Sequence, residues 1–301
     1  MGKARQETEV REQQPHDMDA QDTPAAACGV PEPAPDLEPV PPAQTTASFV
    51  YAIGRVEPRF PSLAVEKEVA QVIGREQTAG LTDRQALRSV LTDRSNRYLA
   101  RQMCWLFTVE GLETYILLPR DPTDVDLLID ALRPEPSVDD VDIVIGVRGP
   151  IAPPEACNSL LVPMVIFDQL YSFTCEDLIR ELPRPDGQTP EGFRATAEEV
   201  FNQIRQVCDN AGSMDEHRAL NYLVVRYPAI YARAVEAHAE ESALSGVEVR
   251  PSPLSGTRSV MDVIFSYVNR RTDFAEKYFV RVDVSEEFPF LVSKLATFYD
   301  R

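Results

Sequence analysis

Residues 104–118 read CWLFTVEGLETYILL, and this stretch decides how we expect the chain to fold. Two runs of apolar, β-branched and aromatic residues flank Glu110-Gly111, a dipeptide that suits a tight turn. The pattern predicts a β-hairpin whose two strands are these runs. We therefore expect at least one sheet with antiparallel neighbours.

Outside the hairpin, strand-like sequences gather toward both ends of the chain. They are residues 49–53, 141–147, 160–167, 247–250, 260–268 and 278–284, with a short addition at 290–295. Helical spacing or capping signals occur at residues 61–76, 82–93, 123–132, 174–182, 196–210 and 213–242. Strands at both ends with helices in the middle predict an α+β fold, a mixed or antiparallel sheet with hairpins packed by a central group of helices.

The last of these helices carries two signals of its own. Ser213-Met-Asp-Glu216 fits a capping box, in which the first and fourth side chains satisfy backbone N–H groups at a helix start. Pro228 lies inside the helical pattern and predicts a kink, because proline removes one backbone hydrogen bond. We expect a single kinked helix over residues 213–242.

The first 48 residues differ in composition from the rest. They hold 8 of the 25 prolines and no aromatic residue, so they cannot bury enough apolar surface to offset the entropy lost on ordering. We expect a disordered, proline-rich acidic tail over residues 1–48 and a single α+β domain over residues 49–301.

The chain has 48 acidic and 30 basic residues, a formal net charge of −18 at pH 7. This charge repels phosphate backbones and anionic lipid headgroups, so neither nucleic acid nor a membrane is an expected partner. No stretch approaches the roughly 20 apolar residues that span a bilayer, and no hydrophobic signal segment is present. The five cysteines include no Cys-x-x-Cys pair, which fits reduced thiols in a cytoplasmic protein.

Five short motifs occur in order along the chain. They are Tyr51-Ala-Ile-Gly54, the hairpin over residues 105–119, Tyr171-Ser-Phe173, Arg218-Ala-Leu-Asn-Tyr222, and Val282-Asp-Val-Ser285 with Pro289. Together they resemble the C-terminal domain of the cyanobactin-type PatG and PatA maturation proteins. The resemblance implies a part in pathways of ribosomally made, post-translationally modified peptides (RiPPs). It does not extend to the PatG-type protease, and it implies no particular reaction.

One of these motifs supplies the best polar group of candidate binding residues. Arg218, Asn221 and Tyr222 are spaced i, i+3 and i+4, so on a helix they share one face, beside Asp215. Arginine and asparagine offer the donors that hold a peptide carboxylate or backbone. The alternative is a buried network that joins the helix to a sheet.

Three aromatic residues complete the candidates. Trp105 is the only tryptophan and lies on the hairpin motif. It is expected either as a core anchor whose N–H meets a carbonyl or as a docking residue for a peptide. Tyr115 and Tyr171 lie on family motifs and join it as binding candidates.

The sequence offers no recognisable catalytic set. His217 and His238 have no cysteine or carboxylate at zinc-ligand spacing, and no phosphate-binding loop or G-x-S-x-G elbow is present. We therefore predict no metal and no cofactor. The functional hypothesis is a non-catalytic accessory or scaffold protein that binds a peptide-maturation enzyme or its precursor peptide.

Two alternatives stay open. The first is a peptide-modifying enzyme with a cysteine nucleophile, for which Cys104, Cys157 and Cys208 are the candidates. The second is a purely structural oligomer such as a homodimer. A reactive thiol would have a lowered pKa and would label quickly at neutral pH, whereas a core thiol would not.

Overall fold

The computed structural model describes residues 48–74, 80–184, 187–206 and 210–299. These residues belong to one compact unit, Thr46–Arg301. Residues 1–47 of the predicted tail lie outside the described part of the chain, and Ser48 opens the first strand.

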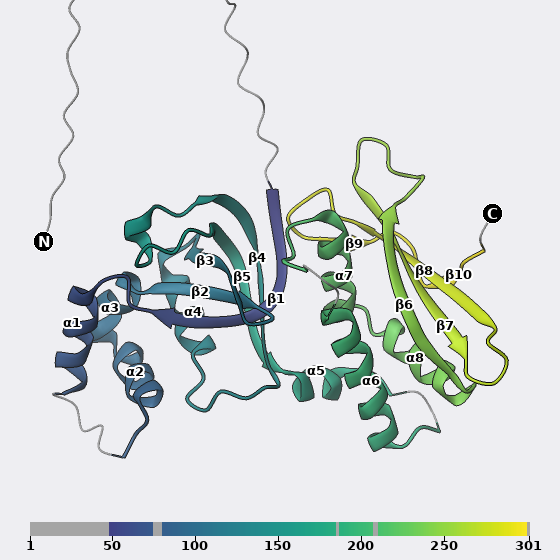
Figure 1. The fold of residues 1–301 in the computed structure, drawn as a ribbon, viewed down its shortest axis with the longest axis horizontal. Coiled ribbons are helices and arrows are strands. Elements are labelled where there is room, and N and C mark those ends of the chain that lie inside the picture. The colour runs from purple at the N-terminus through teal and green to yellow at the C-terminus, as the bar shows by residue number, and fades with distance from the viewer. Residues whose placement is uncertain (1–47, 75–79, 185–186, 207–209, 300–301) are drawn as a thin grey trace, which may run out of the picture. The chain divides into compact units, whose positions relative to one another are not determined.

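Five strands of the first half form a closed barrel (Figure 1). They are β1 (Ser48–Arg59), β2 (Cys104–Val109), β3 (Leu112–Pro119), β4 (Asp140–Ile151) and β5 (Pro163–Thr174). Their order is β1-β2-β3-β5-β4, with β4 pairing back onto β1, and every pair is antiparallel except the parallel pair β3–β5. The predicted hairpin is confirmed as β2–β3, which turns at Glu110 and Gly111.

Helices cover the part of the barrel that surrounds Trp105 and Phe107. They are α1 (Leu63–Ile73), α2 (Asp83–Thr92), α3 (Arg97–Gln102) and α4 (Val125–Ala131). Their apolar faces and the inward side chains of the barrel form one buried cluster. Residues 104–107 of β2 are all buried, so this strand is apolar on both of its faces.

The second half consists of helices and an antiparallel sheet. The helices are α5 (Cys175–Glu181), α6 (Pro190–Arg205), α7 (Asp215–Arg226) and α8 (Ala229–Ala239). The strands are β6 (Ser242–Pro251), β7 (Val260–Asn269), β8 (Ala275–Asp283), β9 (Phe290–Leu291) and β10 (Ala296–Thr297), in the order β10-β8-β7-β6 with β9 beside β8. The helices and one face of the sheet share a second buried cluster, to which Tyr51 and Ile53 of β1 also belong.

The predicted α+β class is confirmed, but the long helix over residues 213–242 is two helices. The chain leaves helical geometry at Tyr227, before Pro228, and α8 begins at Ala229. A residue before proline is disfavoured in the helical region, which explains a break in place of a kink. The expected capping box is also absent, because Met214 occupies the N-cap of α7 without a side-chain hydrogen bond.

A disulfide joins Cys104 of β2 to Cys157, with the two Cα atoms 5.5 Å apart. Both residues are buried in a small cluster with Leu106, Ile116 and Ala152. The expectation of reduced thiols is therefore wrong for this pair. Sequence spacing could not reveal the bond, because 53 residues separate the two cysteines and the barrel brings them together.

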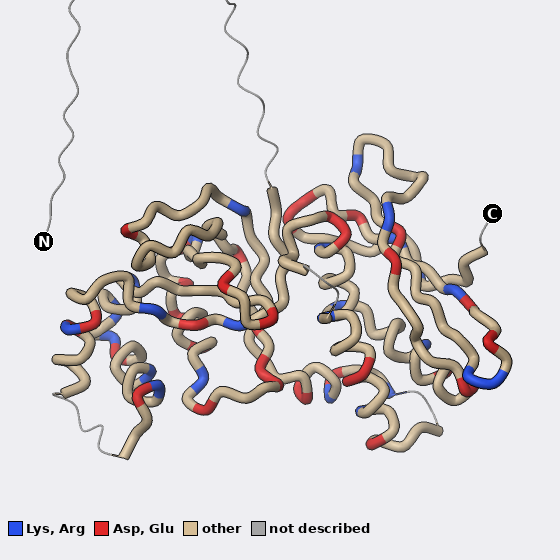
Figure 2. The backbone as a smooth tube through the Cα atoms, in the orientation of Figure 1, with Lys and Arg blue, Asp and Glu red and all other residues tan. Residues whose placement is uncertain are grey.

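Acidic and basic residues are both scattered along the two halves of the chain (Figure 2). The acidity is thus spread over the described residues and not confined to one segment. No helix in the described ranges has the length and apolarity that crossing a bilayer requires.

Candidate functional site

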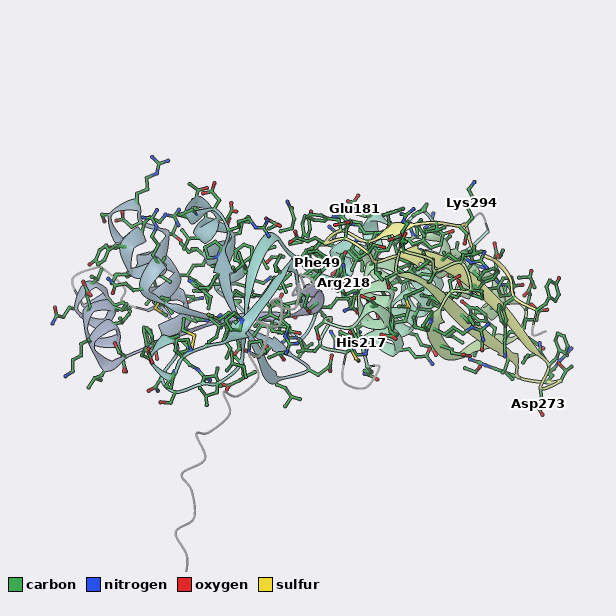
Figure 3. The ribbon with its side chains drawn as sticks, turned by 90° about the horizontal axis from the view of Figure 1, so that it is seen from above. Phe49, Glu181, His217, Arg218, Asp273 and Lys294 are labelled. Atoms are coloured by element: carbon green, nitrogen blue, oxygen red, sulfur yellow. A yellow bond between two sulfur atoms is a disulfide. The ribbon has the colours of Figure 1, made fainter. Side chains whose placement is uncertain are left out.

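Arg218 of α7 lies buried between the barrel and the C-terminal sheet, with 2% of its surface exposed. Its guanidinium donates to three main-chain carbonyl oxygens after β8, those of Val284 (2.6 Å), Glu286 and Glu287 (3.4 Å). It also pairs with Asp215 at 3.2 Å and lies over the ring of Phe49 in β1 (Figure 3). Burial lowers the pKa of Arg218, and Asp215 partly offsets that effect.

Asn221, one turn further along α7, is fully buried and bonds to the barrel. Its amide donates to the Tyr51 carbonyl at 2.8 Å, and it exchanges two hydrogen bonds with Asn210 at 2.7 and 3.0 Å. The Tyr51 N–H donates to the Gly212 carbonyl at 2.8 Å. Gly212 has a φ of +71°, and a Cβ there would lie 2.3 Å from the Tyr51 carbonyl oxygen, so the contact requires glycine. These bonds fasten α7 to β1.

Tyr222 and Tyr171 are half-buried, and both lie near Tyr51. The rings of Tyr51 and Tyr222 meet edge to face at 6.4 Å, and the Arg226 guanidinium lies 5.0 Å from the centre of the Tyr171 ring. Tyr171 donates its hydroxyl to Gln169 at 2.9 Å. The structure therefore brings Arg218, Asn221 and both tyrosines to one interface between helix and barrel.

Trp105 and Tyr115 lie elsewhere, in the barrel core. Trp105 is 3% exposed and donates its indole N–H to the Ala100 carbonyl at 2.9 Å. This placement corresponds to a core anchor. Tyr115 is equally buried, but its hydroxyl reaches the edge of a cavity and donates to the Ala211 carbonyl at 2.8 Å.

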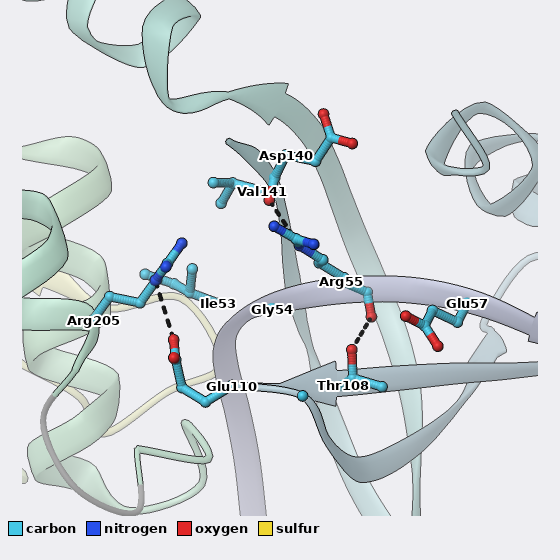
Figure 4. A pocket seen from close by; sticks show the side chains of 10 residues that line it. Ile53, Gly54, Arg55, Glu57, Thr108, Glu110, Asp140, Val141 and Arg205 are labelled. Carbon is cyan, nitrogen blue, oxygen red and sulfur yellow. Dashed lines mark hydrogen bonds and ion pairs between the residues drawn. The ribbon is translucent and has the colours of Figure 1, made fainter. Parts of the chain in front are cut away.

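Two cavities lie beside the turn of the β2–β3 hairpin and share Glu110 and Arg205 as wall residues. The turn places Glu110 (φ 49°) and Gly111 (φ 79°) in the left-handed region. Glu110 thereby meets Arg205, the last residue of α6, in an ion pair of 3.1 Å (Figure 4). This pair separates a small cavity from a larger one.

The small cavity has a volume of about 200 Å³ and polar walls (Figure 4). Arg55 donates to the Asp140 carbonyl at 3.3 Å, and the Thr108 hydroxyl lies 3.4 Å from the Arg55 carbonyl. Gly54 lets the two strands approach here, since a Cβ at this position would lie 2.2 Å from the Thr108 carbonyl oxygen. Arg55 is therefore occupied by backbone partners, and Arg205 by Glu110.

The larger cavity has a volume of about 640 Å³, within the range of about 300–1,000 Å³ usual for ligand pockets. Its apolar wall comes from the hairpin, the segment before β5 and the loop before α7: Val109, Leu112, Val162, Pro163 and Ala211. Its polar wall includes Glu113, Tyr115, Arg148, Gln206 and Ser213. Burial raises the pKa of Tyr115, so its hydroxyl stays protonated and can donate.

Arg148, Arg205 and Glu110 were not among the candidates from sequence. The turn signal at Glu110-Gly111 and the candidate Tyr115 pointed to this place, but the cavity itself arises where α6 and the hairpin meet in space. Within the described ranges, no group of three or more histidine, cysteine or acidic residues could hold a metal ion.

The chain is thus an α+β module with an open, partly apolar cavity beside a barrel. Residues 187–298 match the family model described as PatG C-terminal. The fold is similar to a solved structure titled "PatG Domain of Unknown Function", with a TM-score of 0.65 and 18% sequence identity. The match covers 83% of this chain and 98% of that chain. The comparison with curated proteins gave no match.

The resemblance to the PatG C-terminal domain is confirmed by these two findings. The family model includes the Arg218 and Val282 motifs, whereas the Tyr51 motif, the hairpin and the Tyr171 motif lie before its first matched residue. At 18% identity the structural match carries the fold alone.

Proposed function

We propose that this protein is a non-catalytic accessory or scaffold module in RiPP biosynthesis. A PatG-related domain implies a role in this kind of pathway. In our proposal, the module holds a peptide-maturation enzyme or its precursor peptide at the larger cavity beside the hairpin. The observation that carries the proposal is the combination of the PatG match with an open cavity of about 640 Å³.

The geometry of the larger cavity supports a peptide as the ligand. An apolar wall offers contacts for side chains, while Gln206, Ser213 and the arginines offer donors for a peptide backbone. Leu112 at the hairpin tip is 72% exposed, so apolar surface is available to a partner without any rearrangement.

The described cysteines do not support the alternative of a cysteine enzyme. Cys104 and Cys157 share a disulfide and have no thiol to act as a nucleophile. Cys175 is buried, and desolvation raises its pKa to about 11, so its thiolate is scarce at neutral pH. Cys208 lies outside the described residues.

Two experiments test the proposal. The first is to read the genes beside this one, which should encode a short precursor peptide or a peptide-modifying enzyme. If they encode neither, the pathway assignment is wrong.

The second experiment is photo-crosslinking in the native producer, with benzoylphenylalanine in place of Leu112. The matched control carries the same group in place of Val138, which is 79% exposed and does not line the cavity. We expect the precursor peptide or a maturation enzyme to be captured from position 112 and not from position 138. Capture at both positions, or of unrelated proteins only, would contradict a partner site at the hairpin.

A further inference from the structure

We infer that the larger cavity recognises the C-terminal carboxylate of a peptide that ends in an apolar residue, with Arg148 as the anchor. This inference rests on the proposed binding of a peptide at this cavity. It adds the chemical class of the ligand and the residue that selects it.

The charged residues that line the larger cavity differ in whether they have a partner. Glu110 pairs with Arg205 at 3.1 Å, and Glu113 pairs with Arg59. Arg148 also lines the cavity, is exposed, and has no hydrogen-bond or ion-pair partner in the described part of the chain. Among the described residues, Glu110 is thus paired with Arg205 in the wall and Glu113 with Arg59 outside it, while Arg148 is the wall arginine that has no carboxylate partner.

Two hydroxyl groups share the cavity wall with Arg148, those of Tyr115 and Ser213. Arg148 is close enough to the Tyr115 hydroxyl to act on its pKa, and Ser213 interacts with the same hydroxyl. Arg148, Tyr115 and Ser213 therefore line the same cavity as the apolar residues Val109 and Val162. The Tyr115 hydroxyl already donates its proton to the Ala211 carbonyl, so the donor for a ligand carboxylate is the Arg148 guanidinium, which can bind both carboxylate oxygens.

Arg148, unpaired within the described ranges, suits a single carboxylate better than a phosphate group. One arginine matches one negative charge, whereas phosphate groups are usually held by several cations or by helix N-termini. The protein carries a net charge of −18, so its general field repels anions and a local cation is needed to attract one. The wall residues Val109, Leu112 and Val162 lie in the same cavity and would contact the apolar side chain next to the carboxylate.

The test compares a labelled five-residue peptide ending in leucine as the free acid and as the C-terminal amide, by fluorescence anisotropy with the full chain. We expect the acid to bind about 10-fold more tightly than the amide, the size of one charge-assisted hydrogen-bonding group. In Arg148→Gln this preference should disappear. Arg101→Gln, which replaces an exposed arginine of α3 away from the cavity, should behave like the unaltered protein.

Other outcomes distinguish a failure of the carboxylate anchor from a failure of the proposed peptide site. Equal binding of acid and amide, or an acid preference retained in Arg148→Gln, overturns the carboxylate anchor and leaves the proposed peptide site standing. Absence of binding by either peptide overturns the inference together with peptide binding at this cavity. N-acetyl-leucine and the unlabelled peptide can be compared as competitors of the labelled acid. If both compete with the same affinity, the ligand is a small apolar acid and the assignment to a peptide end is wrong.

Discussion

Arg218 and Arg148 show how differently one residue type is used in two regions of this molecule. Arg218 is surrounded by backbone carbonyls, an acid and an aromatic ring, and no part of it can meet a ligand without opening the interface. Arg148 is exposed and borders a cavity. In this protein the motif-bearing arginine belongs to the scaffold, while an arginine outside every motif lies at the candidate binding site.

The same division holds for the other candidates. Trp105 and Asn221 are buried and bonded to backbone carbonyls, whereas Tyr115 connects the core to the cavity. If this division is correct, changes in the buried group should reduce stability and changes at the cavity should reduce binding.

The largest expected effect is on the buried side. Trp105→Ala should lower the free energy of unfolding by about 3–5 kcal/mol, the range for truncating a large buried aromatic residue. Urea denaturation followed by circular dichroism measures the change, with Tyr299→Ala at a 79% exposed position as the control. A variant of unchanged stability that no longer binds its partner would assign Trp105 to docking.

A smaller loss is expected from Arg218→Met. The change removes the donor for three carbonyl oxygens and leaves Asp215 without its cation, so stability should fall by about 1–3 kcal/mol. Arg101→Met, at an exposed position, should fall within about 0.5 kcal/mol of the unaltered protein. If Arg218→Met is as stable as this control and has lost peptide binding, the buried network is the ligand site and our division is wrong.

The edge of the same network should respond to pH through Glu287. Burial and the neighbouring carboxyl of Asp168 raise the pKa of Glu287 to about 7, while Arg120 opposes the shift. The folded state then holds this proton more tightly than the unfolded chain, so the group's contribution to stability is present at low pH and is lost as pH rises from about 4.5 to about 7.

Glu287→Gln keeps a neutral group at this position at every pH. The stability of the variant relative to the unaltered protein should therefore increase between pH 5 and pH 7 and stay level above pH 7. Urea denaturation at pH 5, 6, 7 and 8 measures the difference. A difference that is constant over this range would show that Glu287 has an ordinary pKa in the folded protein.

The smallest effect on stability is expected at the cavity. Arg205 and Glu110 are 27% and 47% exposed, and such pairs contribute little, so Arg205→Gln should change stability by no more than about 0.5 kcal/mol. Peptide binding should nevertheless weaken, because the variant leaves Glu110 unpaired in the wall between the cavities. A stability loss as large as that of Arg218→Met would place Arg205 with the scaffold.

The sequence predicted the fold class and the hairpin because both depend on local patterns. Alternation, turn residues and apolar runs identified β2 and β3 almost to the residue. Closure of the barrel could not be predicted, since it depends on the pairing of β4 with β1 and of β3 with β5 across long separations. The division of the long helix at Pro228 was anticipated as a kink only.

The candidate site was less accessible to sequence analysis. The helical spacing of Arg218, Asn221 and Tyr222 correctly placed them on one face, but spacing does not reveal whether that face meets solvent or protein. Arg148 and Arg205 stand on separate elements and carry no shared pattern. Only the folded arrangement brings them to the same cavity.

Hydrogen–deuterium exchange with and without the labelled leucine peptide can show whether the peptide binds at the larger cavity or at the Arg218 network. If the peptide binds at the larger cavity, protection should appear in peptide fragments that include residues 109–115 and residues 205–213. Fragments over residues 218–222 should show little further change, because residues 218–221 are buried and Tyr222 is half-buried in the free protein. Protection confined to residues 218–222, with none at the hairpin, would contradict the account.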